Sequence, residues 1–416
     1  MSASISLQTV LNRWAAGLRQ RHELPVLLRS KGLELKLGNF DHPPELVVDV
    51  QSPQGMSALL QPALDSLGQA YVEGHLDIHG SAQAIMHTVW RLAKLGHEAD
   101  QPGWMARVAR RVSEAVAHTP TLDQQAIAYH YDVSNDFYAR WLDPEMVYSC
   151  AYFENGDETL AQAQLKKLDH ILRKLRLQPG QRLLDIGCGW GALVLRAAQK
   201  FQARCTGITL SQNQYELARE RVRAAGLQDQ VEIRLQDYRD LEGQFDRISS
   251  VGMFEHVGLK NLVDYFRIVA EHLTPDGWAL NHGITSTDAD NGETAFGGGR
   301  FIHRYVFPHG ELPHISTVLD AAQRAGLEPV DVESLRRHYA RTLHCWSDRF
   351  EAQDEALKAL VPEKTWRIWR VYLVGCQWAF ERDQISVFQL LCQRAGQDSH
   401  SLPWSRRWMY DTTAAL

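Results

Sequence analysis

A carboxylate followed by three spaced glycines is the feature whose residue types point most directly to chemistry. The segment runs Asp185-Ile-Gly187-Cys-Gly189-Trp-Gly191. Glycines at this spacing let the backbone turn sharply and approach a ligand closely. The apolar run before the turn predicts a buried strand, and the residues after it predict a helix, whose amino terminus offers free N–H groups to an anionic ligand. The segment is therefore a candidate nucleotide-binding turn, although a purely structural turn can carry the same glycines.

The turn does not match a dinucleotide site. Such a site has the spacing G-x-G-x-x-G and an acidic residue about 20 positions further on, at the end of the second strand. This chain has G-x-G-x-G, and its second strand ends Thr209-Leu210-Ser211 without a carboxylate. NAD is therefore disfavoured as the ligand.

Alternating helices and strands are predicted from about residue 160 onward, and they would position this turn. Apolar residues from Leu165 to Leu175 have helical spacing, and this helix ends at Gln178-Pro179-Gly180. Strands separated by helices favour a parallel sheet. The expected strands are 182–186, 205–209, 231–235, 245–251 and 278–282, the expected helices are 192–200, 214–225 and 262–273, and residues 310–396 are expected to be mostly helical and aromatic.

The first 120 residues lack a nucleotide-binding signature. Helical stripes at 7–18 and 85–93 and a basic segment at 104–111 combine tryptophan with arginine or lysine, as helices at a membrane surface do. Each stripe taken singly is better explained as core, because helices of globular proteins have the same period. Alternating leucines at 33–37, a turn at 38–39 and the run 46–50 predict two strands of a hairpin-like unit.

Composition excludes several classes of protein. The 416 residues are 44% hydrophobic and 23% charged, which is ordinary for globular domains. A net charge of −6 gives no basic field for a nucleic acid. Six scattered cysteines without a CxxC pair fit a reducing compartment, and the absence of a long apolar run predicts neither secretion nor a membrane span. The 12 tryptophans and 18 histidines stand out against this average.

Six motifs, in order along the chain, resemble those of the cyclopropane-fatty-acyl-phospholipid synthases, which are class I S-adenosylmethionine-dependent methyltransferases. The resemblance covers about residues 125–395, and the D-x-G-x-G-x-G turn resembles the first motif of the methyltransferases. The motifs are Tyr148-Ser149-Cys150, 184–191 (LDIGCGWG), 207–211 (GITLS), 236–240 (QDYRD), 250–258 (SVGMFEHVG) and 304–308 (RYVFP).

The resemblance implies a Rossmann-like class I methyltransferase sheet with helices on both faces, an α/β fold, plus a smaller α+β N-terminal lipid-binding domain. The expected divisions are 1–120 for lipid binding and membrane contact, 121–396 for catalysis and 397–416 for a C-terminal tail. The tail lies outside the resemblance and is expected to be either membrane-interfacial or disordered. The shorter mycolic-acid synthases lack the first domain, which favours phospholipid acyl chains as the substrate. A cytoplasmic homodimer, bound peripherally at the inner face of the membrane, is the implied form.

The reaction implied by the resemblance is transfer of a methylene group from S-adenosylmethionine to the cis double bond of an unsaturated phospholipid acyl chain. A carbocation forms, and bound bicarbonate removes a proton from the added methyl to close a cyclopropane ring. The alternatives are a lipid methyltransferase giving methyl- or methylene-branched chains, an amine N-methyltransferase, and a catalytically idle lipid-binding protein. A site for a base that removes a proton from the added methyl group argues against the amine reaction, because an amine lone pair accepts the methyl group without losing a methyl proton.

The bicarbonate site of the family carries over to five positions of this chain. Hydroxyl, imidazole and backbone N–H groups can hold an anion, and a carboxylate beside it can orient its hydrogen and should have a raised pKa. Taken singly, each residue is better explained by packing, by a satisfied core histidine or by helix capping. The five positions are Cys150, Glu255, His282, the backbone of Ile284, and Tyr339.

The cofactor site also carries over from the family. Thr209 and Gln214 stand where an acid would usually hold the ribose. The histidines at 303, 309, 314 and 338 have no ligand spacing for a metal, so none is expected, and the glycine-rich stretch 291–299 predicts a loop or lid. The cofactor positions are Tyr148, Ser149, Asp185, Gly187, Cys188, Gly189, Gly191, Thr209, Leu210, Gln214, Asp237 and Tyr238.

Overall fold

The computed structural model describes residues 24–30, 32–97, 133–289, 298–307, 311–397 and 402–411, together with residues 12, 15 and 16. These residues form two compact units. Unit 1 combines the described residues of 1–112, 293–306 and 350–378, and unit 2 combines those of 113–292, 307–349 and 379–416. The expected boundary at 120, most of the predicted helix at 7–18, the basic segment at 104–111 and most of the predicted loop at 291–299 lie outside the described residues.

Unit 1 contains a four-stranded sheet with the order β2-β1-β3-β4. The two predicted strands form, but the prediction that they belong to one hairpin-like unit is wrong, because β1 lies between them. Gly32, at φ 81°, makes the tight turn from β1 into β2 that the sequence analysis missed. The strands β1 (Val26–Ser30) and β2 (Leu33–Lys36) pair antiparallel, β1 and β3 (Leu46–Val50) pair parallel, and β3 and β4 (Leu76–His79) pair antiparallel.

The helices of unit 1 come from distant parts of the chain. The predicted helix at 85–93 is confirmed as part of α4, whose Met86 packs with Trp378 in a small apolar cluster. Arg370 donates to Glu351 Oε1 at 2.8 Å and to the hydroxyl of Tyr71 at 3.1 Å. The helices are α2 (Pro53–Leu60), α3 (Leu64–Val72), α4 (Ala82–His97), α12 (Gly298–Tyr305) and α15 (Asp354–Lys358), with residues 350–352 of α14 (Arg336–Ala352) and 363–378 of α16 (Glu363–Glu381).

Unit 2 is built on a seven-stranded sheet with the order β10-β11-β9-β8-β5-β6-β7. The strands expected at 182–186, 231–235 and 245–251 are confirmed at those bounds. The strands are β5 (Arg182–Ile186), β6 (Arg204–Thr209), β7 (Val231–Leu235), β8 (Phe245–Val251), β9 (Leu273–Ser286), β10 (Leu327–Ser334) and β11 (Ile385–Arg394).

The prediction of a parallel sheet holds for six strands and is wrong for β11, which runs antiparallel to both β9 and β10. Neither β10 nor β11 was predicted, since both lie in the region expected to be mostly helical. β11 pairs with β9 and β10 pairs with β11, and such long-range pairing leaves no local signal in the sequence. The strand expected at 278–282 is also longer than predicted, because β9 begins directly where α11 ends.

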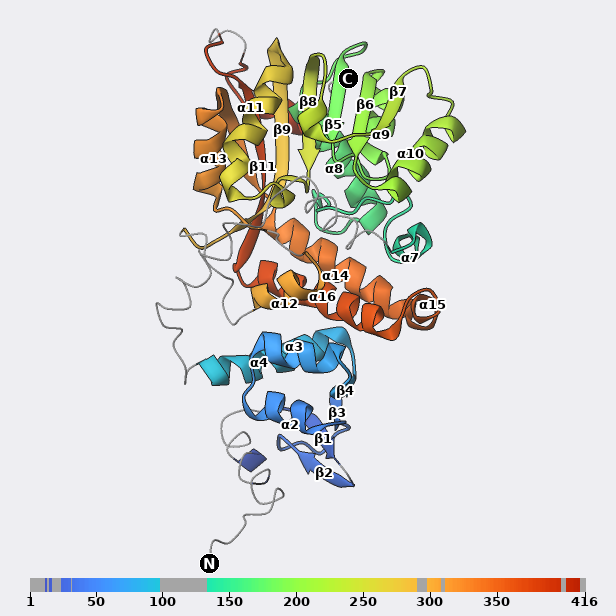
Figure 1. Ribbon diagram of the computed structural model, residues 1–416, viewed down its shortest axis with the longest axis vertical. Helices are drawn as coiled ribbons and strands as arrows, with labels where there is room; N and C mark the ends of the chain where they lie inside the picture. The colour runs from blue at the N-terminus through green and yellow to red at the C-terminus, as the bar shows by residue number, and fades with distance from the viewer. Residues whose placement is uncertain are drawn as a thin grey trace, which may run out of the picture. The chain divides into compact units, whose positions relative to one another are not determined.

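Helices cover both faces of this sheet (Figure 1). One face packs in an apolar core that includes Leu183, Cys205 and Leu280, and the other packs in a core that includes Leu184, Ile208 and Ala279. Alternate residues of each strand enter opposite cores, as strand geometry requires. The helices of unit 2 that precede the C-terminal tail are α7 (Asn135–Ala139), α8 (Leu160–Lys174), α9 (Ala192–Phe201), α10 (Gln212–Ala224), α11 (Leu262–His272) and α13 (Ile315–Arg324), with residues 336–349 of α14 and 379–381 of α16.

The described part of the C-terminal tail is folded onto unit 2, so the prediction of a disordered segment is wrong, whereas the alternative of a membrane-interfacial tail stays a prediction. The short helix α17 (Arg407–Tyr410) buries Met409 in the core beside α8. Trp408 packs edge-on against Trp278 with ring centroids 5.6 Å apart, and Arg406 pairs with the buried carboxylate of Asp331 at 2.6 Å. An apolar side chain and an ion pair therefore anchor the tail.

Candidate active site

The glycine-rich turn lies where the strand order of the sheet reverses. β5 carries the turn at its carboxyl end and has β6 on one side and β8 on the other. Ligands of open α/β sheets bind at such a switch point, at the carboxyl ends of the strands. The amides of Gly187 and Cys188 both donate to the carbonyl of Ile208, at 3.0 and 2.9 Å, which ties the turn to β6.

The three glycines have left-handed backbones, with φ of 76° at Gly187, 55° at Gly189 and 83° at Gly191. Such angles are strained for other residues, which explains the spacing of the motif. Gly191 is the N-cap residue of α9, and a Cβ atom added there would lie 3.3 Å from Cβ of Ala218 on α10. Its role is thus to let α9 approach α10 closely.

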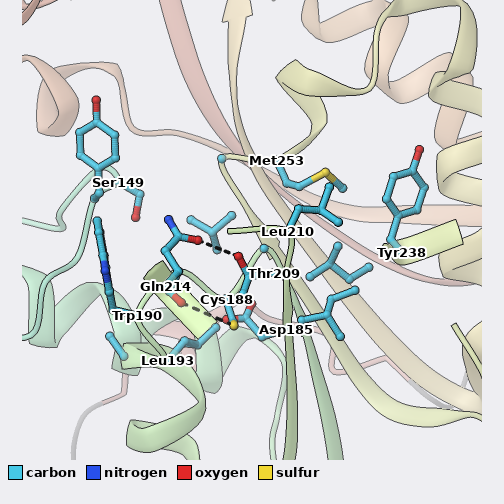
Figure 2. A pocket seen from close by; sticks show the side chains of 18 of the residues that line it. Ser149, Asp185, Cys188, Trp190, Leu193, Thr209, Leu210, Gln214, Tyr238 and Met253 are labelled. Atoms are coloured by element: carbon cyan, nitrogen blue, oxygen red, sulfur yellow. Dashed lines mark hydrogen bonds between the residues drawn. The ribbon is translucent and has the colours of Figure 1, made fainter. Parts of the chain in front are cut away.

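A pocket opens above this turn, and Figure 2 shows Trp190 and Tyr238 at opposite ends of it, with Gln214 and Thr209 between them. Of the predicted cofactor positions, all except Gly191 line the pocket. Residues that the sequence analysis did not assign also line it, among them Met146, Lys167, Trp190, Leu193, Gln236, Arg239, Met253 and His256.

Asp185 and Lys167 bring opposite charges to the wall of the pocket. The Oδ1 atom of Asp185 accepts from the hydroxyl of Ser249 at 2.7 Å, and Lys167 Nζ donates to the hydroxyl of Ser149 at 2.9 Å. Burial raises the pKa of Asp185 to about 7 and lowers the pKa of Lys167 to about 8. A ligand with its own charged groups would strengthen both ionised forms.

The ends of β6 and β7 contribute polar groups to the pocket, and these groups differ in whether they can still bind a ligand. Thr209 Oγ1 donates to Gln214 Oε1 at 2.7 Å, so the amide nitrogen of Gln214 still has hydrogens to offer to a hydroxyl-bearing ligand. Both oxygens of Asp237 accept from the guanidinium of Arg239, at 2.9 and 2.6 Å, which lowers the pKa of Asp237 despite its burial. Asp237 is thus a fixed acceptor within the pocket wall.

The five positions of the predicted anion site do not line this pocket, but the structure connects them to one another. Glu255 lies in a short 3-10 helix, Phe254–His256, and its Oε1 accepts from the amide of Ile284 on β9 at 2.7 Å. That amide, which the resemblance assigns to an anion, is therefore already engaged. Phe254 holds this short helix on β9, because only a glycine at position 283 leaves room for its ring.

Two buried polar atoms of this group have no hydrogen-bond partner among the described residues: Glu255 Oε2 and His282 Nε2. Burial raises the pKa of Glu255 to about 7 and lowers the pKa of His282 to about 3. Leaving such groups unpaired costs about 1–3 kcal/mol each, and small polar ligands or water commonly occupy such places. An anion that also carries a hydrogen fits this donor and acceptor set.

Gln389 sets the tautomer of His282. The two residues face each other across β11 and β9, and Nε2 of Gln389 lies 3.3 Å from Nδ1 of His282. An amide nitrogen can only donate, so Nδ1 is the acceptor and the ring proton of the neutral imidazole resides on Nε2. The unpartnered Nε2 of His282 is thereby a donor.

Cys150 and Tyr339 meet at the carbonyl of Leu335. The thiol of Cys150 lies 3.7 Å from that oxygen, the amide of Tyr339 donates to it at 3.0 Å, and the amide of Leu335 donates to Val387, the cross-strand partner of Ile284. Burial raises the pKa of Cys150, so the thiol stays neutral and acts as a weak donor.

An aromatic wall connects the two groups of residues. The ring of Trp346 lies 5.3 Å from that of Tyr148 in the pocket and 6.0 Å from that of Tyr339, and Phe380 lies 4.6 Å from Tyr339. Trp346 and Trp141 are fully buried. Buried π faces of this kind exclude water and attract positive charge.

Sequence reasoning missed two polar residues of this region, Lys167 and Gln389. The helical spacing places Lys167 on the same apolar face as Leu168, Ile171 and Leu175. A lysine on an apolar helix face is unusual, and this signal could have identified it as a buried residue. Gln389 could not be found, because its role depends on the register of β11 against β9.

Within the parts of the chain that the structure covers, no helix is long and apolar enough to cross a membrane. The same residues contain no group of three or more histidine, cysteine or acidic side chains in an arrangement that could bind a metal ion.

Comparisons with known proteins agree with this geometry. A family model described as mycolic acid cyclopropane synthetase matches residues 118–390. A "probable fatty acid methyltransferase" of Pseudomonas putida is 46% identical over 93% of this chain and 99% of its own length, and the cyclopropane-fatty-acyl-phospholipid synthase of Escherichia coli K12 is 35% identical over 83% of this chain and 87% of its own.

Solved structures agree as well. A mycolic acid cyclopropane synthase complexed with SAH and CTAB has a TM-score of 0.62 and 37% identity, over 65% of this chain and 98% of the other. The matched relatives and the mixed seven-stranded sheet together show a class I methyltransferase fold. The chain therefore belongs to the mycolic acid cyclopropane synthetase family of methyltransferases.

Proposed function

We propose that this protein transfers a methylene group from S-adenosylmethionine to the cis double bond of an unsaturated phospholipid acyl chain, forming a cyclopropane ring. S-adenosylmethionine supplies an electrophilic methyl group when bound. The pocket at the switch point of the sheet fits it, because it combines an acid, a buried lysine and free amide hydrogens with a glycine turn. These groups match an ammonium, a carboxylate and ribose hydroxyls.

The observation that carries the proposal is the pair of unpartnered buried atoms on Glu255 and His282. Ring closure requires that a proton leave the methyl carbon after it has joined the chain, whereas methylation of an amine or an acid requires no such step. Bicarbonate would supply the base when bound. Glu255 Oε2 would accept its hydrogen, and His282 Nε2, with Cys150 and Tyr339 close by, would hold its oxygens.

The aromatic wall supports the same reaction. An alkene is a weak nucleophile and its product with a methyl cation is positively charged, so the site must align the chain and exclude water. A continuous series of rings runs from the half-buried Tyr148 in the pocket through the buried Trp346 to the buried Tyr339. Each ring face near a cation contributes roughly 0.5–2 kcal/mol.

Phospholipid as the substrate and a peripheral position at the membrane are further parts of the proposal. They are supported by the 35% identity to the Escherichia coli synthase, whose name specifies a fatty-acyl phospholipid, over 83% of this chain. The N-terminal lipid-binding role belongs to unit 1 in this proposal. The implied homodimer stays a prediction.

The test uses purified protein, S-adenosylmethionine and vesicles that contain cis-monounsaturated phosphatidylglycerol and phosphatidylethanolamine. The acyl chains are analysed by mass spectrometry and proton NMR. We expect chains that gain one CH2 unit and lose their olefinic protons. Release of S-adenosylhomocysteine without any change in the lipids would overturn the lipid assignment.

A second candidate is methylation of fatty acyl chains without ring closure. The observation that favours it is the 46% identity to the Pseudomonas putida protein, which is described as a probable fatty acid methyltransferase. The same NMR experiment separates the two, because a methyl-branched or exocyclic methylene product keeps olefinic carbons or shows a methyl signal. Free fatty acid offered beside the vesicles separates the two substrate classes.

A further inference from the structure

Helix α8 carries two fully buried lysines that are compensated very differently. Lys174 forms ion pairs with Asp331 at 3.1 Å and with Glu333 at 2.6 Å. Lys167, two turns earlier, donates to the hydroxyl of Ser149 at 2.9 Å, and no ion pair joins it to a carboxylate among the described residues. The buried carboxylates of Asp143 and Asp185 act on Lys167 only through space, without an ion pair, and so compensate its charge less well than the contacts of Lys174 do. Lys167 can therefore still pair with an anion that enters from outside the protein.

The position of Lys167 restricts what that anion can be. Lys167 and Ser149 line the cofactor pocket, and Asp185 lines the same pocket with one oxygen bound to Ser249. The pocket wall thus offers a positive group and a negative group to one ligand. The amino-acid end of S-adenosylmethionine is a zwitterion that carries a carboxylate and an ammonium.

We propose that Lys167 binds the carboxylate of the amino-acid end of the cofactor, with Ser149 holding the lysine ammonium in place. This inference deepens the proposed function, since it rests on the assignment of the pocket to S-adenosylmethionine. Asp185 then faces the cofactor's ammonium. The glycine turn leaves the backbone open for this approach.

The ionisation of Lys167 gives the proposal a second readout. Burial lowers the pKa of Lys167 to about 8, so the lysine of the free protein loses its proton near that pH. A carboxylate ligand requires the ammonium form. Asp185, which faces the ligand's ammonium, must be ionised as well, and burial raises its pKa to about 7. The affinity should therefore rise as the pH approaches 7 and fall about tenfold for each pH unit above 8.

The experiment measures binding rather than turnover, by titration calorimetry. Two ligands are compared: S-adenosylhomocysteine, and its decarboxylated analogue S-adenosyl-3-thiopropylamine, which keeps the ammonium group. The variants are Lys167→Met and Lys167→Gln, of which the second keeps a hydrogen-bond donor without the charge. The matched control is Lys166→Met, which removes a lysine from the adjacent, more exposed position on the same helix.

For the wild-type protein we expect S-adenosylhomocysteine to bind about 10- to 100-fold more tightly than the analogue. Both Lys167 variants should lose that preference and bind the analogue within about twofold of wild type, and the control should keep it. With S-adenosylhomocysteine, the loss of affinity above pH 8 should occur in the wild type and in the Lys166→Met control, and it should be absent from both Lys167 variants.

Two results separate this inference from the proposed function. Equal loss of both ligands in the Lys167 variants, or retention of the preference, would overturn the role of Lys167 and leave the methyltransferase assignment intact. Failure of the wild-type protein to bind S-adenosylhomocysteine at all would overturn the cofactor assignment itself, and the proposed function with it.

Discussion

Replacement of Gly283 by alanine tests how the fold places Glu255. A Cβ atom at position 283 would lie 1.7 Å from Cε1 and 2.3 Å from Cδ1 of Phe254, whereas ordinary contact begins at 3.4 Å. The ring would have to retreat by about 1.7 Å, but Phe254 is only 2% exposed and belongs to an apolar core, whose close packing resists such a shift. We expect the variant to lose about 1–3 kcal/mol of unfolding free energy, which is the usual cost of overpacking.

The effect should reach the site, because Phe254 begins the short 3-10 helix that carries Glu255. Urea unfolding followed by tryptophan fluorescence gives the stability, and lipid product analysis gives the turnover. Gly375→Ala is the matched control, since no atom lies within 4 Å of its added Cβ and alanine is the better helix former by about 1 kcal/mol. Phe254→Leu combined with Gly283→Ala should restore part of the stability. Wild-type stability and turnover in Gly283→Ala would refute the contact that positions Glu255.

Three further predictions follow from the structure. Glu255→Gln should lower turnover by about 100-fold or more while S-adenosylhomocysteine affinity stays within about twofold, and equal loss of both would contradict its role beside the base. The same variant tests the ionisation of Glu255, because burial raises the pKa of this carboxyl from 4.5 to about 7. The protonated form of Glu255 stabilises the fold at low pH, and this contribution of about 3 kcal/mol is lost as the pH rises through 7. Urea titrations from pH 4.5 to 8 should show a smaller decline for the variant, and parallel curves would refute the shift. Gln389→Leu removes the donor to His282 Nδ1 and should lower turnover about tenfold, with a change of the ring tautomer in nitrogen NMR; an unchanged tautomer would contradict the assignment. Arg370→Met removes a hydrogen-bond donor from Glu351 and from the carbonyls of Ile78 and Gly80 in unit 1. Amide hydrogen exchange in β4 should therefore accelerate by a factor that corresponds to about 3 kcal/mol, while the affinity for S-adenosylhomocysteine is kept. Unaltered exchange would show that the arginine is dispensable.

The strands whose apolar pattern is local in the sequence could be predicted. β5, β7 and β8 are short apolar runs bounded by turn residues, and the glycine motif placed the cofactor turn at the correct strand end. β10 and β11 were not predictable, because β11 forms by pairing with β9, which is distant in the sequence, and β10 forms in turn by pairing with β11. The hairpin assigned to β2 and β3 failed for a related reason, since β3 pairs with β1 through a parallel register rather than with its neighbour in sequence.

The candidate site divides in the same way. Motif residues identified most of the pocket lining, because the motifs at 184–191, 207–211, 236–240 and 250–258 lie at the carboxyl ends of β5, β6, β7 and β8, which meet at one edge of the sheet. Lys167 was not predicted as a site residue, because a lysine on a helix is ordinarily exposed to solvent. Only its helical spacing from Ile171 indicates that it is buried. Gln389 matters only through its register with His282, and the aromatic wall joins Tyr148 to Tyr339 from elements that are almost two hundred residues apart.

The most direct measurement of the central claim uses S-adenosylmethionine whose methyl group carries three deuterium atoms, with vesicles of cis-monounsaturated phospholipid. If the proton lost in the reaction comes from the transferred methyl, the lipid product should contain a cyclopropane ring with two deuterium atoms and no olefinic protons. A product that keeps all three deuterium atoms, or that retains a carbon–carbon double bond, would contradict methylene transfer with ring closure.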